Sequence, residues 1–239
     1  MNEKLRLAII PARVGSKRIP KKNIKNFVGN PIIKYSIDAA IKSNLFDKVI
    51  VSTDDETIAN ISRSFGAEVP FLRSENTSDD HSHLGDVIYE TINRLDTETK
   101  NIEYICCILA TAPFITSDFL KRCEKAFFDG AFHSLFPVSK YSYPIWRSLS
   151  KEKENNLFKM IWPENLKSRS QDLENTYHDA GMFYFLSTKQ FMEHRTVFLE
   201  KNGGVELHPW FVQDIDNIED WELAEIKFEM LAKKGKFLE

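Results

Sequence analysis

The chain has 239 residues, of which 42% are apolar and 28% are charged, and its formal net charge at pH 7 is −3. A chain of this length can bury a full core as one large domain or as a domain with a sizeable insertion, and its slightly acidic balance argues against extended nucleic-acid binding. No apolar run reaches the length of a membrane span and the N-terminus lacks the pattern of a secretory signal, so we expect a cytoplasmic protein that does not contact a membrane.

Apolar runs rich in β-branched residues alternate with helical periodicity over residues 1–139. LRLAII predicts a first strand, followed by a helix that starts with Asn30 as its cap and Pro31 in its first turn and ends near Phe46. KVIVST predicts a second strand, after which Asp55 caps a helix that stops at Gly66. This alternation predicts an α/β fold with a parallel sheet and helices on both faces.

The alternation continues toward the middle of the chain. Apolar residues three or four positions apart between Leu84 and Leu95 predict a further helix. YICCILA predicts a strand, and core packing is the expected role of the three cysteines because their spacing suits no metal site. A helix is expected to begin at Ser117, and FHSLFPVS predicts the strand after it.

The pattern changes from Lys140 to about Asp179, where aromatic residues and charged turns occur without a sustained helical stripe. We expect one domain over residues 1–239 with a small β-rich lobe inserted at about 140–179. Because such a lobe cannot bury its own aromatic residues well, it is expected to pack on a second subunit and form a homodimer. AGMFYFLS then predicts a strand that returns to the sheet. The last apolar stripe predicts an amphipathic C-terminal helix: Trp221, Ala224, Phe228 and Leu231.

A basic loop, PARVGSKRIPKKN, leaves the first predicted strand at residues 11–23. Open α/β folds bind ligands at this carboxyl edge of the sheet. Gly15 lets the backbone approach a ligand closely, and Ser16 and backbone N–H groups can donate to phosphate oxygens. The loop suits a triphosphate, although it has no Walker or dinucleotide-binding glycine pattern, and a solvated loop or a nucleic-acid patch is the alternative. Its cationic residues are Arg13, Lys17, Arg18, Lys21 and Lys22.

Two carboxylates precede the C-terminal helix in VQDIDNIEDW. Asp214 and Asp216 lie two residues apart, so both side chains project from one face of an extended segment. Mg²⁺ typically binds one or two protein carboxylates together with waters and substrate phosphates. The pair therefore predicts a magnesium site, with helix capping by Asp216 and a solvated Asp214 as the alternative.

Several long stretches are similar to one enzyme family: IIPARVGSKRIPKKNIKNFVGNPIIKYSI, VIVSTDDETIA, GAEVPFLR and DIDNIEDW. They resemble the acylneuraminate cytidylyltransferases, which make CMP-activated nonulosonic acids. CCILATAPF, YSYPIWRSL, SRSQDLENTYHDAGMFYF and WFVQDIDNIEDW look closest to the subgroup that acts on pseudaminic acid. The resemblance implies a Rossmann-like, GT-A-like nucleotidyltransferase with a mixed sheet. It also implies the reaction, in which the anomeric hydroxyl of a nine-carbon sugar acid attacks the α-phosphorus of CTP and pyrophosphate leaves.

The resemblance further implies roles for single residues. Arg13, Lys22, Asp214 and Asp216 would be catalytic, with the two aspartates holding Mg²⁺. The nucleotide would contact Arg13, Ser16, Lys17, Lys22, Asn23, Arg73 and Ser82. The sugar acid would contact Thr111, Arg169, Gln171, His178 and Asp179, with Arg169 suited to its carboxylate or, alternatively, held in a surface or interface ion pair.

Some positions depart from the family pattern or leave alternatives open. Leu109 stands where sialic acid enzymes typically carry Gln, which argues for a deoxygenated sugar tail, and the aromatic GMFYF is expected to offer that tail an apolar surface. Met182 stands where the pseudaminic subgroup has Gln, so CMP-N-acetylneuraminic or CMP-legionaminic acid synthesis remains an alternative. His81 and His83 could be metal ligands, but a solvated loop is favoured. A non-catalytic nucleotide-binding protein is the distant alternative.

Overall fold

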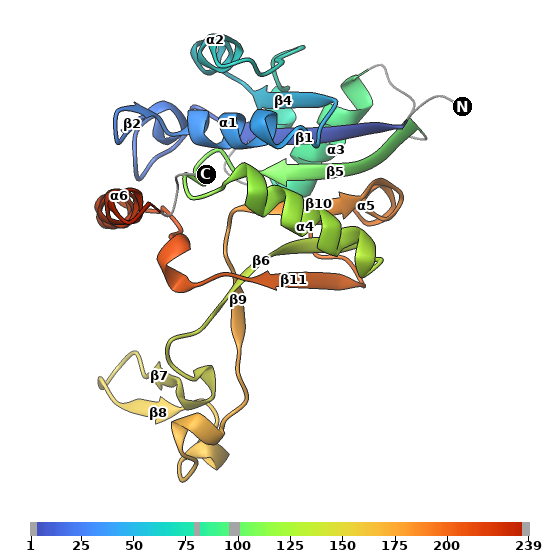
Figure 1. Cartoon of the computed structure of the whole chain (residues 1–239). Helices are drawn as coiled ribbons and strands as arrows, with labels where there is room; N and C mark the ends of the chain where they lie inside the picture. The colour runs from blue at the N-terminus through green and yellow to red at the C-terminus, as the bar shows by residue number, and fades with distance from the viewer. Residues whose placement is uncertain (1–3, 79–81, 96–100, 236–239) are drawn as a thin grey trace.

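The structure is a computed structural model that describes residues 4–78, 82–95 and 101–235. Within these residues, seven strands form one mixed sheet in the order β11-β6-β10-β5-β1-β4, with β9 paired to β6 (Figure 1). β1 is parallel to β4 and β5, whereas β10 is antiparallel to β5 and β6. The strands span Leu5–Ala12 (β1), Lys48–Thr53 (β4), Ile102–Ile108 (β5), Ser134–Lys140 (β6), Tyr177–Asp179 (β9), Phe183–Ser187 (β10) and Asn202–Glu206 (β11).

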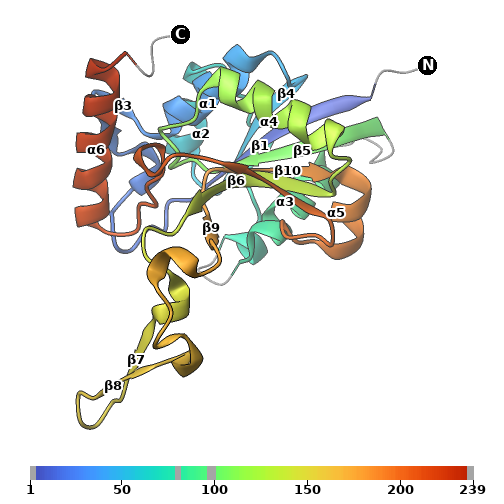
Figure 2. The same ribbon diagram turned by 60° about the horizontal axis from the view of Figure 1, so that its bottom comes forward.

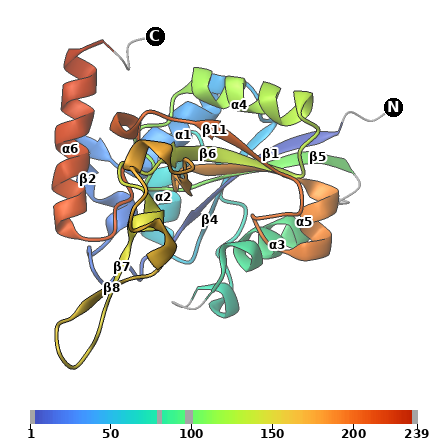
Figure 3. The same cartoon turned by 90° about the horizontal axis from the view of Figure 1, so that it is seen from below.

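Helices cover both faces of the sheet, as the sequence predicted (Figure 3). α1 and α4 pack together on one face, in a core cluster that also includes residues of α2 and α6. α3 and α5 cover the opposite face, where Ile88, Ile92 and Phe191 are buried. None of the helices in the described ranges is long and apolar enough to cross a membrane. The helices span Ile33–Ser43 (α1), Glu56–Ser64 (α2), Leu84–Arg94 (α3), Ser117–Asp129 (α4), Thr188–His194 (α5) and Ile218–Lys233 (α6).

The predicted cap of α2 is confirmed, and the predicted start of α1 is wrong. The Asp55 side chain accepts a hydrogen bond from the backbone N–H of Ile58 at 2.8 Å, and this satisfies a free donor of the first helical turn. Asn30 and Pro31 instead form strand β3, which pairs with β2 (Asn26–Phe27), and α1 begins at Ile33. The φ angle to which proline is restricted suits the first turn of a helix and also an edge strand. Asn30 and Pro31 therefore pair with β2 in a hairpin before the helix begins.

The sheet is not wholly parallel, because the chain changes direction after β6. It returns beside β6 as the antiparallel strand β9, and β10 then runs against its neighbours. The sequence did not predict α5 or β11. The β11 sequence NGGVE has two glycines and no apolar alternation, so neither β propensity nor periodicity marks it as a strand. The three cysteines are buried and free, as expected.

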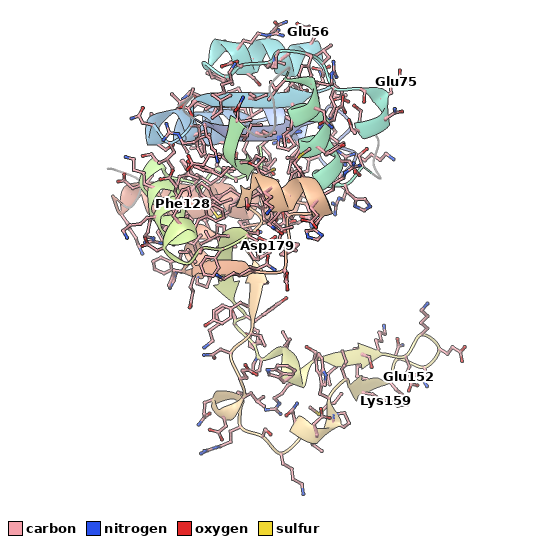
Figure 4. The ribbon with its side chains drawn as sticks, turned by 90° about the vertical axis from the view of Figure 1, so that its right-hand side faces the viewer. Glu56, Glu75, Phe128, Glu152, Lys159 and Asp179 are labelled. Atoms are coloured by element: carbon pink, nitrogen blue, oxygen red, sulfur yellow. The ribbon has the colours of Figure 1, made fainter. Side chains whose placement is uncertain are left out.

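Residues 141–176 form a lobe that projects from the sheet between β6 and β9 (Figures 1 and 2). Its regular part is a hairpin of β7 (Leu149–Lys151) and β8 (Phe158–Met160). No residue of this stretch is buried, and Tyr143 is 84% exposed. Glu152 and Lys159, at the far end of the hairpin, form an ion pair (Figure 4). The lobe therefore leaves apolar side chains exposed in the single chain: Tyr143, Leu149, Leu157, Phe158, Ile161 and Leu166.

Candidate active site

A cleft of about 520 Å³ opens at the carboxyl edge of β1 and β5. Leu109 and Thr111, which follow β5, lie on its wall, and the basic loop that follows β1 forms another side. Open α/β sheets place ligands at this edge. The cleft brings together the following residues that the sequence and the resemblance nominated: Arg13, Ser16, Lys17, Arg18, Lys22, Asn23, Arg73, Ser82, Leu109, Thr111 and Asp216.

The basic loop is held in place from within. Ile19 is buried and anchors its middle. Asn23 is also buried, and its side-chain amide donates to the backbone carbonyl of Arg13 at 2.8 Å. Lys21 adopts a left-handed conformation with φ of 53°, which turns the chain toward Lys22. The loop thus has a defined shape, and Asn23 contributes to it by joining the two ends of the basic run.

Lys22 connects the basic loop to the acidic segment 193 residues further along the chain. Its Nζ donates to the backbone carbonyl of Ile215 at 2.5 Å and lies 3.9 Å from Asp216 Oδ1. The side chain is only 21% exposed. Burial lowers the pKa of Lys22, while the charges of Asp216 and Asp214 act against that lowering. Arg18 reaches the same carboxylate, with its guanidinium 2.8 Å from Asp216 Oδ1.

The acidic segment lies outside the helices and strands, and its carboxylates do not cap the helix that follows it. Asn217 caps α6 in a capping box with Asp220, so the alternative of capping by Asp216 is wrong. Asp216 lines the cleft. Asp214 is accessible to solvent, yet desolvation by the surrounding chain, and then the charge of Asp216, raise its pKa.

The donor chemistry of this segment fits Mg²⁺. Asp214 and Asp216 supply carboxylate oxygens, and two charges that repel one another are relieved by a cation. The described residues contain no group of three or more His, Cys, Asp or Glu side chains that could hold a metal. A softer metal would need nitrogen or sulfur ligands, whereas Mg²⁺ completes its coordination with waters and phosphates. His81 lies outside the described residues.

Arg73 presents a buried guanidinium to the cleft. Its side chain is 3% exposed, and its nearest acid is Asp54, whose Oδ1 lies 3.9 Å away. Its Nε is buried and has no hydrogen-bond partner among the residues that the structure describes. Burial lowers the pKa of Arg73, and the charges of Asp54 and Glu90 oppose this. A buried donor without a partner costs free energy, so a ligand acceptor that reached it would be bound favourably.

The sequence analysis missed Asp54, which follows β4 at the same sheet edge. Its carboxylate accepts a hydrogen bond from the backbone N–H of Val14 at 3.2 Å and also faces Arg73. Asp54 therefore connects the basic loop to Arg73, which follows α2 in the chain. Its position directly after KVIVST was the available signal, because polar residues at the ends of parallel strands gather at one edge.

The four predicted sugar-binding residues of the lobe and its base lie outside the cleft of their own chain. Arg169 pairs with Asp172 at 2.7 Å on the exposed lobe, and Gln171 lies beside it. The ring of His178 lies tilted against that of Tyr141, with the ring centroids 5.0 Å apart. Asp179, at the junction of lobe and sheet (Figure 4), accepts hydrogen bonds from the Tyr184 hydroxyl and from the backbone N–H of Gly181. Within one chain, only Thr111 of the predicted acceptor set reaches the cleft.

The expected aromatic surface of GMFYF does not exist. Phe183 and Phe185 are fully buried, and Met182 and Tyr184 are nearly so. Their strand, β10, lies inside the sheet between β5 and β6, with helices on both faces, so these rings belong to the core. Among the apolar residues that do line the cleft are Leu109, Leu84 and Val87.

Known proteins with similar sequences include cytidylyltransferases. The sequence model of a family described as cytidylyltransferase matches residues 7–233. A pseudaminic acid cytidylyltransferase of Campylobacter jejuni is 41% identical over 94% of this chain and 96% of the relative. The CMP-N,N'-diacetyllegionaminic acid synthase of Legionella pneumophila is 31% identical over 94% and 96%, respectively.

Solved structures share the fold at lower identity. CMP:2-keto-3-deoxy-manno-octonic acid synthetase, in a structure described as a complex with CTP, is 16% identical, covers 96% of this chain and 99% of its own, and has a TM-score of 0.67. This likeness shows a shared fold. The family match over residues 7–233, together with the 41% identical relative, shows that this chain belongs to the cytidylyltransferase family.

Proposed function

We propose that this protein transfers CMP from CTP to the anomeric hydroxyl of pseudaminic acid and releases pyrophosphate. The observation that carries the proposal is the contact between the basic loop and the acidic segment on one cleft, in a chain 41% identical to a pseudaminic acid cytidylyltransferase. We further propose that the enzyme is cytoplasmic, since CTP is a cytoplasmic nucleotide. The direct test is formation of CMP-sugar and pyrophosphate from CTP, Mg²⁺ and purified pseudaminic acid.

The cations of the cleft suit in-line attack at the α-phosphorus. Arg13, Lys17 and Arg18 line the same cleft as Asp216 and are suited to hold the triphosphate. Lys22 is placed to balance charge on the nonbridging oxygens of the α-phosphate as the sugar oxygen approaches. Because Lys22 is held by Ile215, its Nζ is positioned before CTP binds.

Asp214 and Asp216 are the residues we propose for Mg²⁺. A bound Mg²⁺ supplies positive charge to the phosphate oxygens and eases the departure of pyrophosphate. In the structure Arg18 pairs with Asp216. The guanidinium is mostly exposed, so it can turn from this carboxylate to a phosphate oxygen when CTP binds.

We expect kcat/KM for pseudaminic acid to exceed that for N-acetylneuraminic acid by at least about tenfold. Leu109 lines the cleft with an apolar side chain where a polar amide could serve a hydroxylated tail, and a buried hydroxyl left unpaired costs about 1 to 3 kcal/mol. The measurement is initial rate under matched CTP and Mg²⁺ with both sugars and with legionaminic acid, whose tail is also deoxygenated. A better rate with N-acetylneuraminic acid would exclude the pseudaminic assignment while leaving cytidylyl transfer intact.

We propose that the active form is a homodimer in which the lobe covers its exposed apolar side chains and brings Arg169 to the acceptor end of the neighbour's cleft. Light scattering should give twice the chain mass of 27.8 kDa. Mixing Arg169→Ala with Asp216→Asn under conditions of subunit exchange should restore activity that each variant lacks alone, because a mixed dimer holds one intact site. A fully active monomer, or mixtures no more active than their parents, would contradict the shared site.

A further inference from the structure

Glu90, on α3, forms hydrogen bonds with a turn that contributes to one wall of the cleft. Glu90 accepts hydrogen bonds from Thr77, the last residue of the turn Glu75–Thr77, and from Ser74, which precedes the turn (Figure 4 labels Glu75). Its side chain is only 13% exposed. Thr77 also lines the nucleotide cleft, so the residue that donates to the Glu90 carboxylate is in contact with the space open to a ligand.

The two carboxylate oxygens of Glu90 have distinct partners. Oε1 accepts from the backbone N–H of Ser74 and from Arg94, each at 2.9 Å. Oε2 accepts from the Ser74 hydroxyl at 3.0 Å and from the Thr77 hydroxyl. Arg94 is itself fixed by a hydrogen bond to the carbonyl of Leu72 at 2.7 Å and by stacking on Phe71 at 4.0 Å. The orientation of the carboxylate is thus determined by its surroundings.

Glu90 remains ionised throughout the neutral range. Its partial burial acts to raise the pKa, but the hydrogen bonds from Thr77, Ser74 and Arg94 outweigh it and hold the pKa at about 2. An ionised carboxylate can only accept hydrogen bonds. A hydroxyl has one proton, and Thr77 directs it to this carboxylate at a shorter contact than the 3.5 Å to the Ser74 carbonyl. Toward the cleft, Thr77 then presents lone pairs alone.

The cleft wall around Thr77 has the character of a base site. Leu84 and Val87 lie on the same cleft, and their apolar side chains suit the flat face of a nucleobase, while the buried Arg73 offers donors. Cytosine carries an amino group at position 4, a donor, where uracil carries a carbonyl oxygen, an acceptor. An oxygen that can only accept a hydrogen bond can pair with the amino group of cytosine, but it repels the carbonyl oxygen of uracil.

We propose that Thr77, with its hydroxyl polarity set by Glu90, selects cytosine over uracil by accepting a hydrogen bond from the 4-amino group. Thr77 is a binding residue in this proposal and Glu90 is a positioning residue. The inference rests on the proposed function for the use of CTP, and it adds how the same site rejects UTP.

Glu90→Gln tests the polarity itself. Because Ser74 N–H and Arg94 both donate at the Oε1 position, the Gln carbonyl must take that position and its amino group must face Thr77. The amide then donates to the Thr77 oxygen, and the threonine proton becomes free to point into the cleft, where it can serve the uracil carbonyl. We expect UTP to gain affinity, and the ratio of UTP to CTP dissociation constants to fall at least about tenfold.

The measurement is equilibrium binding of CTP and of UTP, each with Mg²⁺ and without any sugar, by calorimetry. Thr77→Val should lower the same ratio by weakening CTP, and Thr77→Ser should retain it because the hydroxyl remains. The double variant Thr77→Val with Glu90→Gln should match Thr77→Val alone, because Glu90 acts through Thr77. Ser78→Ala is the matched control: it removes a hydroxyl that donates to the Ser74 carbonyl in the same turn and should leave the ratio unchanged.

A merely structural role for Glu90 or Thr77 would weaken CTP and UTP together and leave their ratio within about twofold of the original, which would overturn the proposal. If Glu90→Gln does not fold, Thr77→Val against Thr77→Ser decides the question by the same ratio. Failure of the unaltered protein to bind CTP would reject the proposed function as well. Preferred CTP binding with a ratio insensitive to these variants would reject this inference alone.

Discussion

Asp216→Asn should lower kcat/KM at least about 10²-fold, because a metal ion contributes several kcal/mol to charge stabilisation in such a reaction and each 1.36 kcal/mol is a factor of ten. The neutral amide keeps the size of the side chain but gives up the charge that we propose for Mg²⁺. The measurement is steady-state release of pyrophosphate at several Mg²⁺ concentrations, and the concentration for half-maximal rate should rise.

Two controls separate the metal role of Asp216 from its other contacts. Glu219→Gln removes an exposed carboxylate in the first turn of α6 and should leave the rate and its Mg²⁺ dependence unchanged. Arg18→Met breaks the same ion pair as Asp216→Asn but retains the carboxylate, so it should not raise the Mg²⁺ requirement. Near-normal turnover of a folded Asp216→Asn protein would remove Asp216 from the metal assignment.

Lys22→Met should lower kcat about 10²- to 10³-fold, the size of effect expected when one preorganised charge-stabilising group is removed. The methionine fills a similar volume but cannot donate to Ile215 or to a phosphate oxygen. Because the proposed interaction is strongest as the α-phosphorus is attacked, kcat should fall more than KM for CTP rises. Single-turnover rates with saturating CTP provide the measurement.

Lys21→Met is the matched control for Lys22. Lys21 is exposed, has the same charge and is not on the cleft wall, so its substitution tests loss of net charge in the loop without loss of the positioned amine. We expect little change in kcat. If kcat fell equally in the two variants, the total positive charge of the loop would be what matters. The placement of Lys22 by Ile215 would then have no separate role. Thermal unfolding of both variants checks that the contact to Ile215 is not needed for folding.

The sequence by itself predicted most of the local elements and indicated the type of ligand. Alternating apolar runs predicted the strands and helices on both faces, because side-chain periodicity reports directly which face of an element is buried. Asp55 marked the start of α2 because its cap is made within four residues. The cationic loop after β1 and the pair Asp214 and Asp216 were visible by residue type, and they indicated phosphate and metal chemistry before any contact was known.

The tertiary structure decided which of these groups meet. Local propensity carries no information on contacts between segments far apart in the chain, and the hydrogen bond from Lys22 to Ile215 joins residues 193 positions apart. Strand direction is likewise set by the path of the chain, so the return through β9 turned β10 antiparallel and buried the rings of Phe183 and Phe185. The same long-range packing left Arg169 on the lobe, away from its own cleft.

The polarity of Thr77 shows most directly what only the folded chain decides. A threonine hydroxyl can donate or accept, and nothing in the local sequence selects between the two. Glu90, thirteen residues along the chain, accepts the hydrogen bond of the Thr77 hydroxyl, because α3 packs against the turn and Arg94 fixes the carboxylate. The residue type is a property of the sequence, whereas the direction of its hydrogen bond is a property of the packing.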